Sequence, residues 1–458
     1  MINSNATISD LTRRGTLAAI FGAYSYAAMI VAGPWLFTVL GLSFLSATAC
    51  DGTCLDLTIF RSVVIYNSMF SLIITSPLAF FAGRYTSRQI YRGSEDHVYY
   101  VLVLSLAIFL AVVLLLVVSF YVFGTTLEAI ESLASIHTLF LIGCAWLLIP
   151  FLGAIRAHNQ IIFAFGAGSL AILLFSHIPV DTTVTSLLLS FNGGFTIIDL
   201  IMMCVIVRRF GCAIVVDRDL IGELREVWEL PLAGFAYALG LWIDKIVMWH
   251  LAPSDSLAVA GLFQTMPSYD TAMFWSQLSS IPVIAIFVVH VETRFSARLS
   301  AFHRAMQARA SLTDLKDLVS DATSLVLSSI VALFGTFTIV AAMMILASVA
   351  FMPQLGLRPA YMSILRISLC AMAFYSSAIL CFNFLLLMDL RRPALRIVFT
   401  FLVLNGALTL AFLPLGPAFY GYGSLFASAA SLLVGFRLLM KELPWIHFHA
   451  FITNNSSL

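Results

Sequence analysis

The chain has 458 residues, of which 61% are hydrophobic and only 10% are charged, and its formal net charge is +1. Ordinary soluble domains have about 25% charged residues, whereas the mean hydropathy of this chain is +1.01. This composition excludes soluble enzymes, nucleic-acid-binding proteins and disordered chains, and it leaves a helical protein that crosses a membrane many times.

Apolar stretches long enough to cross a bilayer, about 20 residues each, follow one another along the whole chain. We predict twelve membrane-spanning helices, at residues 17–45, 59–83, 98–123, 133–155, 161–178, 184–207, 231–252, 271–291, 325–350, 362–388, 394–414 and 420–440. Gly33-Pro34 lies inside the first of these segments and is expected to break that helix.

Basic residues indicate the orientation, because cytoplasmic loops carry an excess of Lys and Arg. With a cytoplasmic N-terminus, 20 of the 24 basic residues fall on the cytoplasmic side, and only Arg358 falls in an outer loop. Both termini are therefore predicted to be cytoplasmic. The first apolar stretch is too long for the core of a cleaved signal peptide, although Arg13-Arg14 precedes it.

The inner segment 208–230 divides the predicted spans into six and six. We therefore predict an N-terminal six-helix bundle at 1–207, a linker at 208–230 and a C-terminal six-helix bundle at 231–458. Such a division is typical of transporters built from two repeats. Apolar and charged residues alternate at helical spacing along 213–230, which predicts an amphipathic helix on the inner surface.

No sequence motif indicates covalent chemistry or metal binding. The chain lacks a GxxxxGK[ST] phosphate loop, an HExxH pair and a Cys/His cluster. We expect a protein that is not an enzyme and that uses no cofactor and no metal. The pairs Gly166/Gly168 and Gly421/Gly423 lie within predicted spans and are expected to pack helices together.

The first outer loop carries Cys50 and Cys54, for which a disulfide and two free thiols both remain open. Asp51 and Asp56 lie in or next to the same loop and are the only feature that favours an integral-membrane glycosyltransferase. Such enzymes have large outer domains or long outer loops, which this chain does not provide, so we regard that alternative as the weakest.

Ionisable residues within the spans are the strongest functional signal, since a charge at mid-membrane costs about 3 kcal/mol or more unless it has a partner or a wet cavity. Asp244 and Lys245 are adjacent in the seventh span, and neighbours on a helix point about 100° apart. We therefore expect each to interact with another helix or with water rather than with each other. The further candidates for a transport path are Asp270, Arg61, Arg366 and Asp199.

Two alternatives stay open for all these groups, which either line the path or hold helices together. Trp242 and Tyr237 likewise either line a sugar path, because aromatic faces stack on sugar rings, or pack the spans. At the inner ends, charge-paired caps or gates are expected from Glu292, Asp389, Arg391 and Arg392.

Several segments together resemble one family. They are Ala32–Thr38, Ile243–Trp249, Met266–Phe274 and Met388–Arg392, with Ile281-Pro282 and Val291–Phe295. In these segments and in length the chain resembles the PelG family, the inner-membrane transporters of the Pel exopolysaccharide system. That family lies within the multidrug/oligosaccharidyl-lipid/polysaccharide (MOP) exporter superfamily, which also holds the MATE transporters.

The resemblance implies an all-α protein with two six-helix bundles around a central cavity. It also implies transport of an amino-sugar polysaccharide across the bacterial inner membrane, beside a cytosolic glycosyltransferase and further inner-membrane proteins of the same system. Asp244 and Asp270 are then expected to accept hydrogen bonds from the sugar, with Lys245 and Arg61 balancing their charge. The alternative function is a proton- or sodium-coupled small-molecule antiporter of the same fold, with Asp199 and Asp244 as its ion sites.

Overall fold

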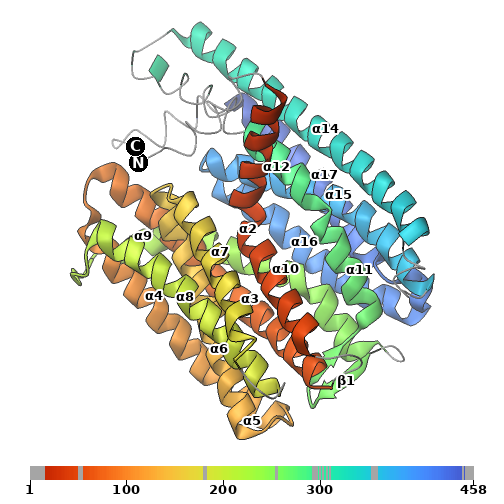
Figure 1. Cartoon of the computed structure of the whole chain (residues 1–458). Helices are drawn as coiled ribbons and strands as arrows, with labels where there is room; N and C mark the ends of the chain where they lie inside the picture. Colours follow the sequence, from red (N-terminus) through yellow and green to blue (C-terminus); the bar gives the residue numbers. More distant parts are fainter. Residues whose placement is uncertain are drawn as a thin grey trace. The chain divides into compact units, whose positions relative to one another are not determined.

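The computed structural model describes residues 16–49, 55–178, 183–252, 256–290, 311–351 and 359–445, together with residues 298, 301, 304, 305, 308 and 448. Nearly all of the described chain is helical (Figure 1). The long helices of the first half are α2 (Leu17–Ala49), α3 (Leu55–Arg92), α4 (Val98–Val112), α6 (Ala129–Ala154), α7 (His158–Phe175) and α8 (Val184–Phe210). Those of the second half are α10 (Glu229–Leu251), α11 (Pro267–Leu278), α12 (Ser280–His290), α14 (Leu312–Phe351), α15 (Pro359–Leu387), α16 (Arg391–Phe412) and α17 (Tyr422–Glu442).

Shorter elements complete the described chain. A π-helical turn at Val113–Val117 joins α4 to α5 (Val118–Gly124), and α9 (Leu220–Glu226) lies between α8 and α10. Two short antiparallel strands, β1 (Leu257–Ala260) and β2 (Phe263–Thr265), follow α10. Single 3-10 turns lie at Glu95–His97, Leu413–Leu415, Pro417–Phe419 and Leu443–Trp445.

Ten of the described helices are long and apolar enough to cross a membrane, and the bent helix α2 makes eleven. The bend in α2 lies next to Pro34, as its sequence predicts, because a proline ring clashes with the carbonyl four residues earlier. The predicted span 271–291 is not one helix: α11 and α12, of 12 and 11 residues, separate at Ser279. Pro282 accounts for this break, since its ring excludes a regular helix at Leu278.

The contacts of the described residues divide the chain into two units. Unit 1 contains residues 1–31, 243–248 and 267–458, and unit 2 contains residues 32–242 and 249–266. Helices α2 and α10 contribute residues to both units. The predicted bundle limits at 207 and 231 stay a prediction.

Unit 2 has α6 near its centre, packed against both α3 and α8, and α8 also packs against α7. Helices α7 and α8 approach each other closely at two glycines. A Cβ atom on Gly194 would lie 2.7 Å from the carbonyl oxygen of Gly168, and one on Gly168 would lie 2.8 Å from that of Gly194. The prediction that Gly168 packs helices is therefore confirmed, because only glycine permits this backbone contact.

The β1–β2 hairpin, absent from the all-helical prediction, packs on α3 within unit 2. The Tyr66 hydroxyl donates to the Gln264 carbonyl oxygen at 2.8 Å and accepts from the Gln264 N–H at 3.0 Å. The Tyr66 ring also stacks on Trp249, with ring centroids 4.8 Å apart, and meets Phe263 edge-on. Tyr66 thus binds the hairpin through both the N–H and the carbonyl oxygen of Gln264 in β2.

Unit 1 is built around α15, which packs against α11, α14 and α17, while α16 packs on α17. Gly423 permits the α16–α17 contact, since a Cβ there would lie 2.6 Å from the Thr409 nitrogen. Gly421 lies within the span Pro417–Trp445, as predicted, but it precedes α17 rather than lying inside it. A Cβ at Gly421 would lie 3.2 Å from Ile367 of α15, and its φ of 92° is a left-handed conformation that favours glycine.

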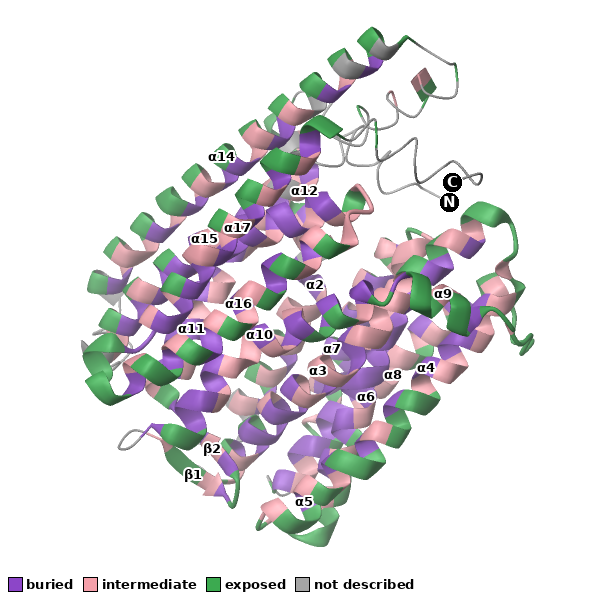
Figure 2. Ribbon diagram, turned by 180° about the vertical axis from the view of Figure 1, so that it is seen from behind, coloured by how far each residue is buried: buried purple, intermediate pink, exposed green. Residues whose placement is uncertain are grey.

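Several spans expose large apolar side chains. Figure 2 shows exposed residues recurring along α14. On α14 these include Val331, Ile339, Met343 and Leu346. A soluble protein rarely exposes so continuous an apolar stripe. Lipid tails cover such a surface in a multi-pass membrane protein, so the exposure agrees with the prediction from composition.

Candidate functional site

The best-defined polar cluster lies within unit 1, where α10 and α11 meet. Asp244 and Lys245 are 3% and 8% exposed, and Tyr269 of α11 is fully buried. The Tyr269 hydroxyl donates to Asp244 Oδ2 at 2.7 Å, and Lys245 Nζ lies 3.4 Å from Asp244 Oδ1. We call these three residues the α10–α11 cluster.

The direct Asp244–Lys245 pair corrects the expectation that these neighbours do not pair with each other. Their Cα–Cβ bonds diverge on the helix, but the long, flexible stem of lysine lets its ammonium group swing back to the carboxylate. Since a buried charge without a partner is costly, this pairing is favoured where water is scarce. The second prediction, that Asp244 interacts with another helix, is met by Tyr269.

Unit 1 also contains buried polar groups outside the cluster. Ile243, which precedes Asp244, lies against Gly406 of α16. Two further buried hydroxyls of unit 1, Ser376 Oγ on α15 and Thr409 Oγ1 on α16, have no hydrogen-bond partner among the described residues. Unmatched hydroxyls in a buried core are costly and favour a site that binds a polar group.

The other predicted charged residues of the spans lie in different settings. Asp270 is half-buried next to Tyr269 at the start of α11. Arg366 on α15 is exposed. Arg61 of unit 2 is also exposed, and its Nε donates to the Ser46 hydroxyl at 3.2 Å.

The aromatic candidates of α10 are packed against rings of unit 2. Tyr237 lies 6.3 Å from Phe80, and Trp242 lies 6.2 Å from Trp249, between ring centroids. Trp249 itself is 1% exposed and stacks on Tyr66. Packing therefore accounts for these rings, and their role in a sugar path stays a prediction.

Asp199 of α8 is the one candidate whose carboxylate oxygens are both buried without any hydrogen-bond partner among the described residues. It lies in unit 2, away in sequence and in unit from the α10–α11 cluster. No group of three or more His, Cys, Asp or Glu side chains able to hold a metal ion occurs in the described part of the chain.

The gate candidates are partly placed. Arg391 Nε lies 3.2 Å from Asp389 Oδ1 at the start of α16, so these two residues pair, and their role as a cap or gate stays a prediction. Asp389 adopts φ 59°, a conformation that lets the chain turn between α15 and α16. Arg392, the next residue in sequence, is exposed. Glu292, Cys50 and Cys54 lie outside the described residues.

An ion-pair network that the sequence did not predict joins the linker to α3 and to the 3-10 turn that follows α3. Its pairs are Arg88–Glu226 at 3.0 Å, Arg88–Glu223 at 3.8 Å, Arg92–Glu223 at 2.9 Å and Arg209–Glu95 at 2.6 Å. The predicted helix within 213–230 is confirmed in part by α9, and much of its surface is exposed (Figure 2). The pairs join segments that the charge count predicts to lie on one side of the membrane.

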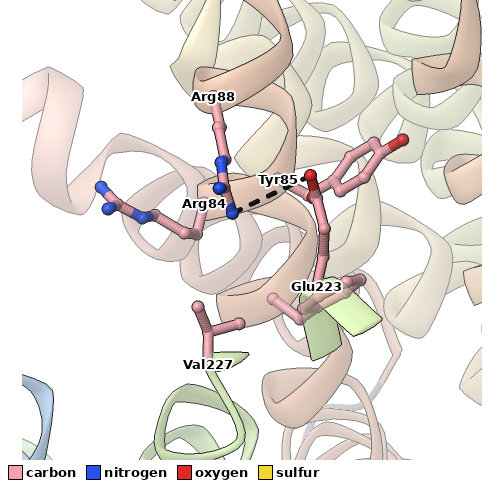
Figure 3. Close-up of a pocket in the computed structure, with 6 residues that line it drawn as sticks. Arg84, Tyr85, Arg88, Glu223 and Val227 are labelled. Carbon is pink, nitrogen blue, oxygen red and sulfur yellow. Dashed lines mark ion pairs between the residues drawn. The ribbon is translucent and has the colours of Figure 1, made fainter. Parts of the chain in front are cut away.

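A small pocket lies inside this network, between α3 and α9. Figure 3 shows Arg88 reaching Glu223 across it, with Arg84, Tyr85 and Val227 around it. Its volume is about 10 Å³, which is room for about one water molecule. The Tyr85 hydroxyl donates to Asp217 at 2.6 Å, which ties a second linker residue to α3. The pocket therefore belongs to a structural clamp rather than to a substrate site.

Comparison with known proteins identifies the family and the fold. The model of the family described as "PelG: Putative exopolysaccharide Exporter (EPS-E)" matches residues 7–451. Among curated proteins, none matches this chain. Twenty solved chains match in structure.

A MATE transporter in its bent conformation has a TM-score of 0.63 at 13% identity, covering 98% of each chain. An outward-facing multidrug resistance MATE transporter of the MOP superfamily has a TM-score of 0.62 at 13% identity, covering 97% of each chain. A MOP superfamily transporter from Pyrococcus furiosus, described as having a binding pocket of reversed polarity, has a TM-score of 0.63 at 12% identity, covering 97% of each chain. At such identities the likeness shows the fold alone, which is the predicted MATE/MOP-like fold.

Proposed function

The chain belongs to the PelG family of exopolysaccharide exporters, and from that premise we propose that it carries an amino-sugar exopolysaccharide across the bacterial inner membrane. The protein is a multi-pass membrane transporter. Its work is then binding and release of the polymer, with no covalent step. Coupling to a cytosolic glycosyltransferase and to other inner-membrane proteins of the Pel system belongs to the same proposal.

The α10–α11 cluster is the observation that supports a polar substrate most directly. A buried ion pair is weak evidence for stability, because well-packed apolar residues serve as well or better. Its retention inside a membrane helix is therefore better explained by a function. We propose that the Asp244 carboxylate accepts hydrogen bonds from sugar hydroxyls or amides, or pairs with an amino-sugar ammonium group, while Lys245 compensates its charge between binding events.

We expect the substitution Asp244→Asn to reduce polymer secretion at least tenfold, because the amide keeps the shape of the carboxylate and loses its charge. Secreted polymer is measured by a lectin or sugar assay in cells complemented with each variant, at matched amounts of protein in the membrane. Asp219→Asn, an exposed carboxylate in the linker, is the matched control and should secrete as the parent does.

Secretion by the Asp244→Asn variant at the parental level would contradict the role of the carboxylate. Deleting the gene tests the broader function. If the protein exports the polymer, its loss leaves polymer inside the cell or stops its synthesis. A protein that instead expels small cationic compounds from liposomes, with unchanged polymer secretion in the deletion strain, would favour the antiporter alternative.

We also propose that both termini and the linker face the cytoplasm. Support comes from the distribution of Lys and Arg and from the ion pairs that gather Arg88, Arg92 and Arg209 with the linker. Cys212 offers a native probe, since it is an exposed free thiol in that linker.

A membrane-impermeant maleimide should label Cys212 only after the cells are permeabilised, as read by mass spectrometry of the peptide that contains it. The Cys212→Ser variant is the control for peptide assignment. Equal labelling in intact cells would place the linker on the outer side and reverse the proposed orientation.

A further inference from the structure

Asp199 presents a problem that the α10–α11 cluster does not explain. Both of its carboxylate oxygens are buried, and neither has a hydrogen-bond partner among the described residues. The residue as a whole is half-buried, so its exposed part is not the carboxylate. An ionised carboxylate buried without a partner is so unfavourable that such a group normally takes up a proton instead.

Hydrogen bonds between α8 and α6 show which residues of the two helices lie at the same height. Asn192 Oδ1 accepts from the Thr138 hydroxyl of α6 at 2.7 Å, and Asn192 Nδ2 donates to the Ala134 carbonyl oxygen at 3.1 Å. The antiparallel helix α7 connects α6 to α8, so α6 and α8 run in the same direction. Asp199 lies seven residues, about two turns, after Asn192 in α8, and Ala145 lies seven residues after Thr138 in α6. Since Asn192 and Thr138 are hydrogen-bonded, Asp199 and Ala145 therefore lie at the same height along the two helices.

The groups of α6 at this level carry no charge. On α6, Ala145 is buried, and the neighbouring Cys144 thiol is also buried. The indole N–H of Trp146, the next residue, is another buried group without a hydrogen-bond partner among the described residues. The nearest basic candidate on α7 is His158 at the start of that helix.

The remaining helices packed on α8 bring no charge to this level. The Asn67–Ser135 hydrogen bond sets the level of α3 against α6, and the contact of Gly143 with Phe109 sets that of α4. The corresponding stretches, 72–80 of α3 and 103–112 of α4, contain no charged residue. His137 of α6 lies about two turns from the level of Asp199, and its Nδ1 is 3.4 Å from Asn192 Nδ2.

We propose that Asp199 is a proton-binding site of unit 2, which carries a proton at rest and releases it during transport, so that export is coupled to protons. The coupling of protons to export rests on the proposed export function, whereas the binding of a proton by Asp199 does not. A sodium ion is less well served, because hard cations need several oxygen ligands. On α6 the side chains at the level of Asp199 are a thiol, a methyl group and an indole, and the buried Thr75 hydroxyl of α3 donates to the carbonyl oxygen of Ser71.

Proton binding can be tested on the purified full-length protein in lipid nanodiscs, without any polymer. Infrared difference spectra between acidic and alkaline buffer report the C=O band of a protonated carboxylic acid. We expect one such band to disappear in Asp199→Asn and to persist in Asp219→Asn. We also expect a hydrophobic carbodiimide to modify Asp199 at neutral pH, as located by mass spectrometry, and to lose this reactivity as the pH rises.

The outcomes separate cleanly. An unchanged spectrum in Asp199→Asn, together with no modification of Asp199 at any pH, would overturn the site. Protection of Asp199 from the carbodiimide by excess sodium at constant pH would make it a sodium site and also overturn the proposal. The carbodiimide experiment uses the unsubstituted protein, so it can be done even if the Asp199→Asn variant folds poorly.

Coupling is then tested in cells. We expect a protonophore to stop polymer secretion in the parent, and Asp199→Asn to secrete at least tenfold less while keeping its amount in the membrane. Parental secretion by the variant, still blocked by the protonophore, would assign the coupling to another group. If the deletion strain secretes normally, the export function fails, whereas the nanodisc result for Asp199 stands independently.

Discussion

Replacing Lys245 by methionine is expected to cause a large loss of stability, because it leaves the Asp244 carboxylate buried and without its cation. Breaking a buried ion pair from one side typically costs about 3–5 kcal/mol. Methionine preserves most of the length and volume of the lysine stem, so the loss reports charge rather than a cavity. Tyr269 still donates to Asp244 at 2.7 Å, but a single neutral donor does not replace a full positive charge.

The apparent melting temperature of the purified protein in detergent measures this effect. The double variant Asp244→Asn/Lys245→Met should recover most of the loss, since neither side chain then carries a charge. Lys441→Met, at an exposed lysine near the end of α17, is the matched control and should melt as the parent does. Additive losses in the double variant would show that the two side chains do not interact in the folded protein.

This double-variant experiment also separates stability from function. If the pair serves transport, the double variant folds well and yet fails to export polymer. If the pair only joins helices, the double variant recovers both stability and export. The comparison therefore decides between the two readings that the sequence leaves open for Asp244 and Lys245.

The second large effect is expected from Gly194→Leu in α8. A Cβ atom at this position would meet the Gly168 backbone oxygen of α7 at 2.7 Å. A flexible side chain can move away from such a clash, but a helix backbone moves only as a whole. The cost should exceed the roughly 1–3 kcal/mol of ordinary overpacking, so α7 and α8 should separate and little folded protein should reach the membrane.

The amount of protein in the membrane fraction and its elution as a single species in size-exclusion chromatography measure this result. Gly335→Leu is the matched control, because Gly335 lies inside α14 and a Cβ there meets nothing within 4 Å. Gly194→Ala should fall between the two. Normal folding of Gly194→Leu would mean that α7 and α8 do not approach as closely as described.

How well the sequence predicted a feature depends on whether that feature is set by a long local stretch of residues or by a single position or a few residues. Hydropathy predicted the spans well, because a membrane helix must show about 20 apolar residues in a row whatever its neighbours are. It failed at 271–291, where Pro282 breaks the helix at a point that average hydropathy does not register. It also missed the β1–β2 hairpin, whose strands have only four and three residues.

In the candidate site, too, the sequence predicted some residues and missed others. The sequence singled out Asp244 and Lys245 as buried ionisable residues, since any charge within a span is exceptional. It did not predict that Tyr269, 25 residues further along, donates to Asp244. Tyr269 was part of the family-like segment Met266–Phe274, and that membership was the only sequence signal for it.

By itself, the sequence determined that this protein crosses a membrane many times and that it belongs with exopolysaccharide exporters, and its arginines predict an orientation. These properties depend on local composition or on family motifs, which are present in every part of the chain before it folds. The tertiary structure alone decided the partners of Asp244, the hold of Tyr66 on Gln264 and the isolation of Asp199. Each of these depends on how a helix is rotated about its axis and on which distant helix faces it, and a pattern of hydropathy along one segment carries no information about either.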